Sequence, residues 1–148
     1  VPLQNLLAVA EALLEAGPVE IALADTIGVG VPWPVQQTFA ALSELAGDVP
    51  MRAHFHDSRN TGIGNAYASL LAGVATLDAS IGGIGGCPFA PNASGNIAME
   101  DLVYMLNRSE VGHDLSMEPL LAAAAWLEPI LGKRLPSMLL KAGDWPAN

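Results

Sequence analysis

The hexapeptide MRAHFH, from Met51 to His56, predicts a β-strand that ends in two histidines separated by one residue. Side chains alternate along a strand, so His54 and His56 point to the same face. Two imidazoles on one face, at the carboxyl end of a parallel strand, can share one metal ion. The alternative is two histidines at a polar strand end with separate hydrogen bonds. Asp57 follows directly, where its carboxylate could orient one of the rings.

Strands and helices alternate on both sides of this hexapeptide. Val19 to Ala24 is a short apolar run typical of a strand buried on both faces, and Thr76 to Ile81 predicts a third strand. Apolar residues at helical spacing, together with proline and glycine boundaries, predict the helices. These are Leu3–Leu14, a helix opened by Pro34 and ended by Gly47, Gly62–Leu71, Asn96–Asn107, and a last helix capped by Ser116 and bent or ended by Pro129.

This order, with short connections, predicts an α/β fold with a parallel sheet. Three strands cannot close a β/α barrel, which needs eight. A doubly wound sheet can consist of three strands, but we would then expect a nucleotide-binding loop in the sequence. The dinucleotide pattern G-x-G-x-x-G fails here because Pro88 occupies the sixth position of the pattern that begins at Gly83, and no P-loop exists.

The composition of the chain limits the classes of partner that it can bind. Hydrophobic residues make up 51% and charged residues 14%, against an average charged fraction of about 25%. We therefore expect apolar surface that is covered by protein outside this chain. The first residue is Val1, followed at once by a helical pattern, which indicates an interior start. A net charge of -9 with six basic residues argues against nucleic acid as a partner, and no run approaches the roughly 18 apolar residues of a membrane span.

Cys87 is the only cysteine, so no internal disulfide can form, which favours a reducing compartment such as the cytoplasm. It lies in a glycine-rich loop predicted from Gly82 to Gly95. Such a loop allows close backbone approach to a ligand and can deliver a thiol to a closed site as a proton donor. The alternative is a small buried hydrophobic residue, which is the usual environment of a free cysteine.

Two further polar residues occupy predicted segment ends. Asp25 ends the first predicted strand, where a carboxylate faces the mouth of a barrel; the alternative is a turn or helix cap. Asn96 ends the glycine-rich loop, and it could cap the next helix or present its amide oxygen to a hard metal ion. When Asp25 and Asn96 are considered separately, the capping role is the favoured interpretation of each.

In combination, these motifs resemble the 3-hydroxy-3-methylglutaryl-CoA lyase family, whose members are metal-dependent carbon–carbon lyases on TIM barrels. The similarity runs from about Val19 to Leu106, in order and with matching spacing. It rests on Asp25-Thr26-Ile27-Gly28, His54-Phe55-His56-Asp57, Gly85-Gly86-Cys87-Pro88-Phe89-Ala90-Pro91, Ser94-Gly95-Asn96-Ile97-Ala98 and Glu100-Asp101-Leu102-Val103-Tyr104-Met105-Leu106.

The resemblance implies the C-terminal part of a (β/α)8 TIM barrel, as a single partial domain over residues 1–148. Residues 19–106 would hold the strands and the site, and residues 107–148 a C-terminal helical segment. The family also needs an Arg-Asp pair on the first barrel strand, which would lie before Val1. After Asp57 the run Ser58-Arg59-Asn60-Thr61-Gly62 departs from the family pattern. The resemblance therefore specifies the reaction type more closely than the identity of the acyl-CoA substrate.

The resemblance also implies roles for single residues. His54, His56 and Asn96 would bind a divalent metal, Mg²⁺ or Mn²⁺. Cys87 would be the catalytic loop cysteine, and Asp25 an active-site acid.

By this resemblance the protein would cleave 3-hydroxy-3-methylglutaryl-CoA, or a related 3-hydroxyacyl-CoA, to acetyl-CoA and a keto acid. We expect an acyl-CoA substrate, a homodimer and no membrane partner. Two alternatives stay open: a Claisen-type acyl-CoA synthase of the same barrel family, and a non-catalytic fragment that packs against a partner.

Overall fold

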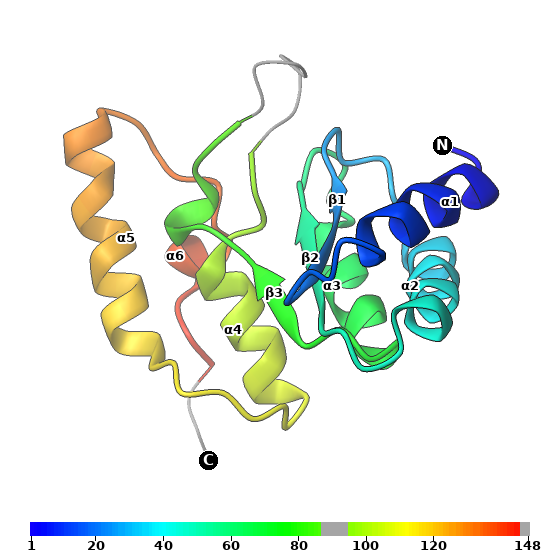
Figure 1. Ribbon diagram of the computed structural model, residues 1–148. Helices are drawn as coiled ribbons and strands as arrows, with labels where there is room; N and C mark the ends of the chain where they lie inside the picture. The colour runs from blue at the N-terminus through cyan, green and yellow to red at the C-terminus, as the bar shows by residue number, and fades with distance from the viewer. Residues whose placement is uncertain (87–94, 146–148) are drawn as a thin grey trace.

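The computed structural model describes residues 1–86 and 95–145 of the chain. Strands alternate with helices through its first half, as the sequence predicts (Figure 1). In chain order the elements are α1 (Leu3–Leu14), β1 (Ile21–Asp25), α2 (Pro32–Ala46), β2 (Met51–Phe55), α3 (Gly62–Leu71), β3 (Thr76–Asp78), the short 3-10 helix η1 (Ile81–Gly83), α4 (Met99–Arg108), α5 (Met117–Leu131) and α6 (Leu139–Ala142).

The three strands form one parallel sheet in the order β1-β2-β3. The register places Ala24 of β1 and Asp78 of β3 on either side of His54 in β2. Asp25 lies opposite Phe55. Within the described residues, β1 and β3 each have a strand partner on one side only. The predicted arrangement of three adjacent parallel strands is therefore confirmed.

The two faces of the sheet differ in chemistry. Met51, Ala53 and Phe55 of β2 are buried against the helices, where the ring of Phe55 meets the ring of Phe39 edge-on at 6.3 Å between centroids. Arg52 and His54 are only partly buried and point to the opposite face, which we call the open face. The apolar core therefore lies on the helix side, and polar side chains gather on the open face.

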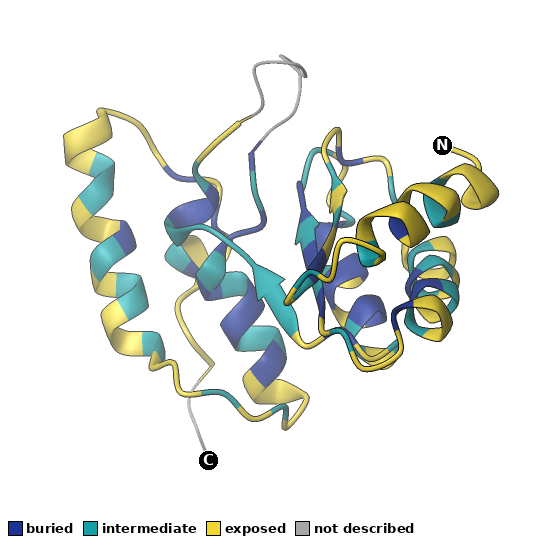
Figure 2. Ribbon diagram, in the orientation of Figure 1, coloured by how far each residue is buried: buried dark blue, intermediate teal, exposed yellow. Residues whose placement is uncertain are grey.

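The later helices form a second group beside the sheet. Helix α4 packs against α3, and α5 lies on the side of α4 away from the sheet (Figure 1). Figure 2 shows buried residues along α4, while α5 is largely exposed or half-buried. Glu100 and Asp101 lie in the first turn of α4 and Arg108 in its last, which suits the helix dipole.

Several element boundaries differ from the sequence prediction by one to three residues, and the two largest differences adjoin η1 and the glycine-rich loop. The third strand was expected to run to Ile81, but β3 ends at Asp78 and η1 follows. The fourth helix was expected to begin at Asn96 but begins at Met99. Asn96 and Ala98 form isolated β-bridges with His56 and Ser80, and this pairing keeps residues 96–98 extended.

Candidate active site

His54 and His56 lie next to each other at the end of β2. Their ring centroids are 5.1 Å apart and the rings are inclined at 67°. His54 belongs to the open face, and His56 is two residues further along the chain. This confirms that the H-x-H pattern brings both imidazoles to one place.

Each imidazole is held through its Nδ1 atom. His56 Nδ1 lies 3.1 Å from the backbone oxygen of Asp25, and a carbonyl oxygen only accepts, so this Nδ1 carries the proton. His54 Nδ1 lies 3.3 Å from Oδ2 of Asp78, a carboxylate that likewise accepts. In the neutral imidazole, both arrangements leave Nε2 with its lone pair, which is the form that binds a metal ion.

Asn96 lies beside this pair. Its backbone bridges to His56, and the neighbouring Ile97 N–H donates to the oxygen of Phe55 at 3.2 Å. The Asn96 amide donates from Nδ2 to the oxygen of Ile84 at 3.1 Å, while its Oδ1 is buried with no hydrogen-bond partner among the described residues. A buried amide oxygen without a donor suits a cation, because burial without a partner costs free energy.

The donors of His54, His56 and Asn96 fit a divalent cation, but they form an incomplete ligand set in the part of the chain that the structure describes. There, no three residues of the types His, Cys, Asp and Glu gather closely enough to hold a metal ion. The available donors are two neutral imidazoles and one amide oxygen. A complete site for Mg²⁺ or Mn²⁺ needs further oxygen ligands, from a carboxylate, from water or from substrate.

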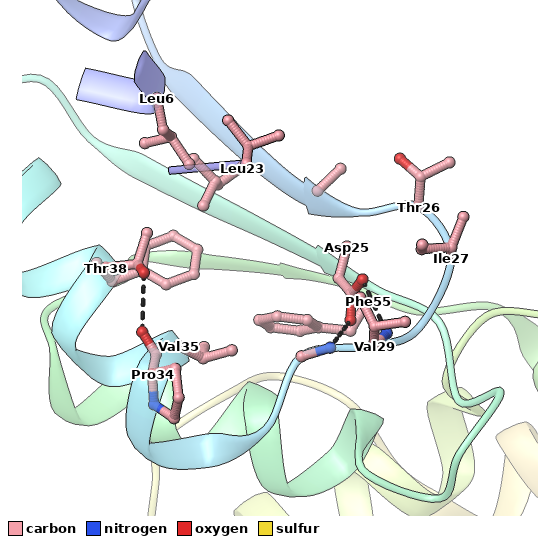
Figure 3. Close-up of a pocket in the computed structure, with 14 residues that line it drawn as sticks. Leu6, Leu23, Asp25, Thr26, Ile27, Val29, Pro34, Val35, Thr38 and Phe55 are labelled. Atoms are coloured by element: carbon pink, nitrogen blue, oxygen red, sulfur yellow. Dashed lines mark hydrogen bonds between the residues drawn. The ribbon is translucent and has the colours of Figure 1, made fainter. Parts of the chain in front are cut away.

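The carboxylate of Asp25 turns away from the imidazoles. Asp25 is in register with Phe55 and not with His54, so its side chain lies on the helix side of the sheet. Its Oδ1 accepts from the Val29 N–H at 3.1 Å and its Oδ2 from the Gly30 N–H at 2.7 Å (Figure 3). The capping role that the sequence left open is thus present, while the backbone oxygen of Asp25 contacts the site through His56.

The pocket in Figure 3 belongs to that helix side. It has a volume of about 410 Å³, and Leu23, Phe55 and Val35 line it together with Asp25. Leu23 is in register with Ala53, a buried residue of the helix side. This pocket therefore opens on the other face of the sheet from His54, and we do not assign it to the substrate.

Asp57 holds the start of α3. Its Oδ1 accepts from the Gly62 N–H at 2.7 Å, and burial raises the pKa of this carboxyl above its ordinary range. In the described structure Asp57 hydrogen-bonds to backbone groups and not to an imidazole. The role of orienting an imidazole, which the sequence suggested for Asp57, is filled instead by Asp78.

Sequence reasoning missed a charged chain on the open face. Arg52 Nε donates to Glu20 at 2.6 Å, and Arg52 Nη1 donates to Oδ1 of Asp78 at 2.5 Å. The Thr76 hydroxyl donates to the other oxygen of Glu20 at 2.9 Å. The hydrogen bond from Arg52 lowers the pKa of Glu20. Strand alternation alone predicts that Arg52 and His54 lie on one face. Their contacts with Asp78 also depend on the register between β2 and β3, which the sequence pattern does not specify.

The base of the glycine-rich loop is fixed from α4. Glu100 is fully buried, and both of its oxygens lie within 3.0 Å of the Gly82 N–H. Asp101 accepts from Ser137 Oγ and from the N–H groups of Met138 and Leu139. Cys87 lies outside the described residues.

No helix in the described part of the chain is both long and apolar enough to span a membrane.

Comparison with known proteins points to one family. Residues 1–127 match the HMGL-like family. The chain is 45% identical over 136 residues to (R)-citramalyl-CoA lyase of Chloroflexus aurantiacus, covering 92% of this chain and 43% of that protein. It is 42% identical over 141 residues to hydroxymethylglutaryl-CoA lyase YngG of Bacillus subtilis, covering 95% of this chain and 47% of that protein.

The structural comparison agrees. An HMG-CoA lyase from Acinetobacter baumannii, solved in complex with coenzyme A and 3-methylmalate, superposes with a TM-score of 0.90 at 35% identity. The match covers 98% of this chain and 49% of that structure. The chain thus spans about half the length of the relatives it matches, and its three strands correspond to part of a TIM-barrel fold.

Proposed function

Because this chain belongs to the HMGL-like family, we propose that it supplies part of the active site of a metal-dependent carbon–carbon lyase acting on an acyl-CoA. One observation carries the proposal. Two imidazoles with occupied Nδ1 atoms lie beside a buried Asn96 oxygen that has no partner among the described residues. A cation shared with the two Nε2 atoms would satisfy the buried Asn96 oxygen, which otherwise has no partner among the described residues.

The proposed substrate is 3-hydroxy-3-methylglutaryl-CoA, cleaved to acetyl-CoA and acetoacetate. A related 3-hydroxyacyl-CoA is the second candidate, because one relative is named (R)-citramalyl-CoA lyase and matches at 45% identity. Both compounds carry a tertiary hydroxyl beta to the thioester. Cleavage in either case removes the hydroxyl proton and releases the acetyl-CoA carbon as an enolate.

His54, His56 and Asn96 would hold the cation, with Mg²⁺ or Mn²⁺ suited to the mixture of imidazole and oxygen donors. When bound, such a cation lowers the pKa of the substrate hydroxyl and fixes its geometry. The chain's own contribution is to hold the two rings in one tautomer. It also excludes competing hydrogen bonds to the Asn96 oxygen.

Asp25 has two possible roles in this proposal, and they differ in a measurable way. As a base it would take the hydroxyl proton, so Asp25→Asn would lower kcat while metal affinity stays unchanged. As a positioning residue it would act through its loop and its contact with His56, so metal affinity would fall as well. The two hydrogen bonds that its carboxylate accepts from Val29 and Gly30 favour positioning.

For Cys87 we propose the role of proton donor to the acetyl-CoA enolate, delivered by the glycine-rich loop. The start of that loop is held in place by Glu100, whose oxygens accept from the Gly82 N–H. Loop closure would also keep water from the enolate.

The test uses the full-length protein with Mg²⁺ or Mn²⁺. 3-Hydroxy-3-methylglutaryl-CoA and citramalyl-CoA are supplied in turn, and acetoacetate, pyruvate and acetyl-CoA are measured. His56→Ala is the site variant, and His113→Ala, the third histidine of the chain, is its matched control. We expect cleavage of one substrate, loss on chelation, loss in His56→Ala and retention in His113→Ala. Full activity after chelation, or condensation of acetyl-CoA with a keto acid as the favoured reaction, would contradict the proposal.

A further inference from the structure

The open face of the sheet carries a charged chain that leads directly to one of the proposed metal ligands. Asp78 stands in register with His54, and its two oxygens have separate partners. Oδ1 accepts from Arg52 at 2.5 Å, and Oδ2 lies 3.3 Å from His54 Nδ1. On the other side of His54 the register position is Ala24, whose methyl group makes no competing hydrogen bond.

We propose that Asp78 is a positioning residue that fixes the tautomer of His54, and that Arg52 holds the Asp78 carboxylate in the orientation this requires. This inference rests on the proposed function of His54 as a metal ligand. Asp78 touches neither metal nor substrate in this assignment. It acts by keeping the His54 proton on Nδ1, so that Nε2 keeps its lone pair.

Arg52 explains why the carboxylate does not rotate. Glu20 binds Arg52 Nε at 2.6 Å and also accepts from Thr76, so the guanidinium is fixed from its far side. The chain Thr76–Glu20–Arg52–Asp78–His54 therefore links β2 and β3 to Glu20, the residue directly before β1. The side chains of Arg52, Asp78 and His54 are each about one third exposed, so the network lies beside the site and not in the apolar core.

Asp78→Asn is the decisive variant, because it keeps the shape and changes one hydrogen-bonding atom. An asparagine has one acceptor oxygen in its side chain, and the charged Arg52 donor forms the stronger hydrogen bond to it. The amide Nδ2–H₂ then faces His54 Nδ1, which must accept. The proton of His54 moves to Nε2, the atom that would bind the metal.

The first measurement needs no metal and no substrate. Full-length protein labelled with ¹⁵N-histidine is examined by long-range ¹H–¹⁵N correlation, which distinguishes the two tautomers, and His54→Gln assigns the signal. We expect an Nδ1–H tautomer at His54 in the wild type and an Nε2–H tautomer in Asp78→Asn. In the double variant Arg52→Met/Asp78→Asn the amide oxygen is released to His54, and the Nδ1–H tautomer returns. Asp48→Asn, at an exposed loop position, is the matched control.

The second measurement is Mn²⁺ affinity, read from the signal of free Mn²⁺ by electron paramagnetic resonance. We expect Asp78→Asn to weaken binding by about tenfold or more, with partial recovery in the double variant. An unchanged tautomer in Asp78→Asn, or an Nε2–H tautomer in the wild type, would overturn the inference. Absence of Mn²⁺ binding by the wild type would count against the proposed function instead, and the tautomer result would still decide the role of Asp78.

Discussion

Both carboxylate oxygens of Glu100 lie within hydrogen-bonding distance of the Gly82 N–H, at 2.9 and 3.0 Å. Glu100 is fully buried, and burial raises its pKa above the ordinary range, against the lowering effect of this hydrogen bond. The folded protein therefore holds the Glu100 proton more tightly than the unfolded chain does. This group stabilises the fold fully below its unfolded pKa, and that contribution is lost as pH rises through the folded pKa.

Glu100→Gln should therefore change how stability depends on pH. Glutamine keeps an acceptor for Gly82 and cannot ionise, so the variant should lose less free energy of unfolding than the wild type as pH rises from about 4 to about 8. The measurement is urea unfolding at several pH values, with Glu44→Gln, exposed on α2, as the control. Parallel pH profiles for the wild type and Glu100→Gln would contradict the expected coupling.

Gly82→Ala should destabilise the protein by about 2–5 kcal/mol. Gly82 has φ +64°, and a Cβ there would collide with the Leu135 side chain. The left-handed conformation costs an L-residue about 1–2 kcal/mol, and overpacking adds about 1–3 kcal/mol. Gly86→Ala is the control, since a Cβ at Gly86 meets no atom within 4 Å among the described residues. Equal denaturant midpoints for the two variants would show that η1 accommodates the methyl group added in Gly82→Ala without loss of stability, and would contradict the prediction.

His54→Ala or His56→Ala should weaken metal affinity by about tenfold or more in the full-length protein. Asn96→Ala should cost less, because water can replace one neutral oxygen ligand. The measurement is metal content after chelation, dialysis and reloading, with His113→Ala as the control. Full metal content and full activity in His56→Ala would end the metal-ligand assignment.

Cys87→Ser should lower turnover more than it changes metal affinity, because the thiol is proposed to act on substrate and not on the ion. Thiol alkylation should inactivate the full-length protein, and a bound substrate analogue should slow the reaction. Cys87 is the only cysteine of this chain, so alkylation within it reports one position. Equal alkylation rates with and without the analogue would favour the alternative of a buried hydrophobic residue.

The strands and the H-x-H pair could be predicted because they depend on local periodicity. The alternation in MRAHFH specifies a strand and a face without knowledge of its neighbours. The apolar run before Asp25 specifies a strand, but burial on both faces was wrong, because Ile21 is the only buried residue of β1. The boundary at Asn96 could not be predicted in the same way. The extended backbone of residues 96–98 depends on bridges from Asn96 to His56 and from Ala98 to Ser80, which are distant in sequence.

The partner of His54 was missed for the same reason. Asp57 was the carboxylate closest in sequence, but it binds Gly62 at the start of α3. Asp78 reaches His54 only through the register of β2 and β3. Asp25 illustrates a related limit. Its position at a strand end was predicted, but the direction of its carboxylate follows from its register with Phe55.

Residues 1–148 on their own leave several surfaces without a partner. In the described structure β1 and β3 each have one open edge, whose backbone groups need hydrogen-bond partners. Val9 and Leu13 of α1 are 62% and 55% exposed, and Val19 beside β1 is 92% exposed. These apolar side chains account for part of the hydrophobic excess in the composition.

We therefore predict that residues 1–148 alone will self-associate and will not turn over substrate. The described ligand set holds two imidazoles and an amide oxygen without a carboxylate, so the charge of a divalent cation is poorly balanced. In the described structure Arg52 is already bound by Glu20 and Asp78, and Arg59 by the backbone oxygens of Ile27 and Gly28, so neither is left to stabilise the enolate. Loss of one such electrostatic donor typically costs about 10² to 10³ in rate. Light scattering after size exclusion should show dimers or larger species, and added Mg²⁺ or Mn²⁺ with 3-hydroxy-3-methylglutaryl-CoA should release no acetoacetate. A monomer that releases acetoacetate at an enzymatic rate would show that these three strands suffice for catalysis.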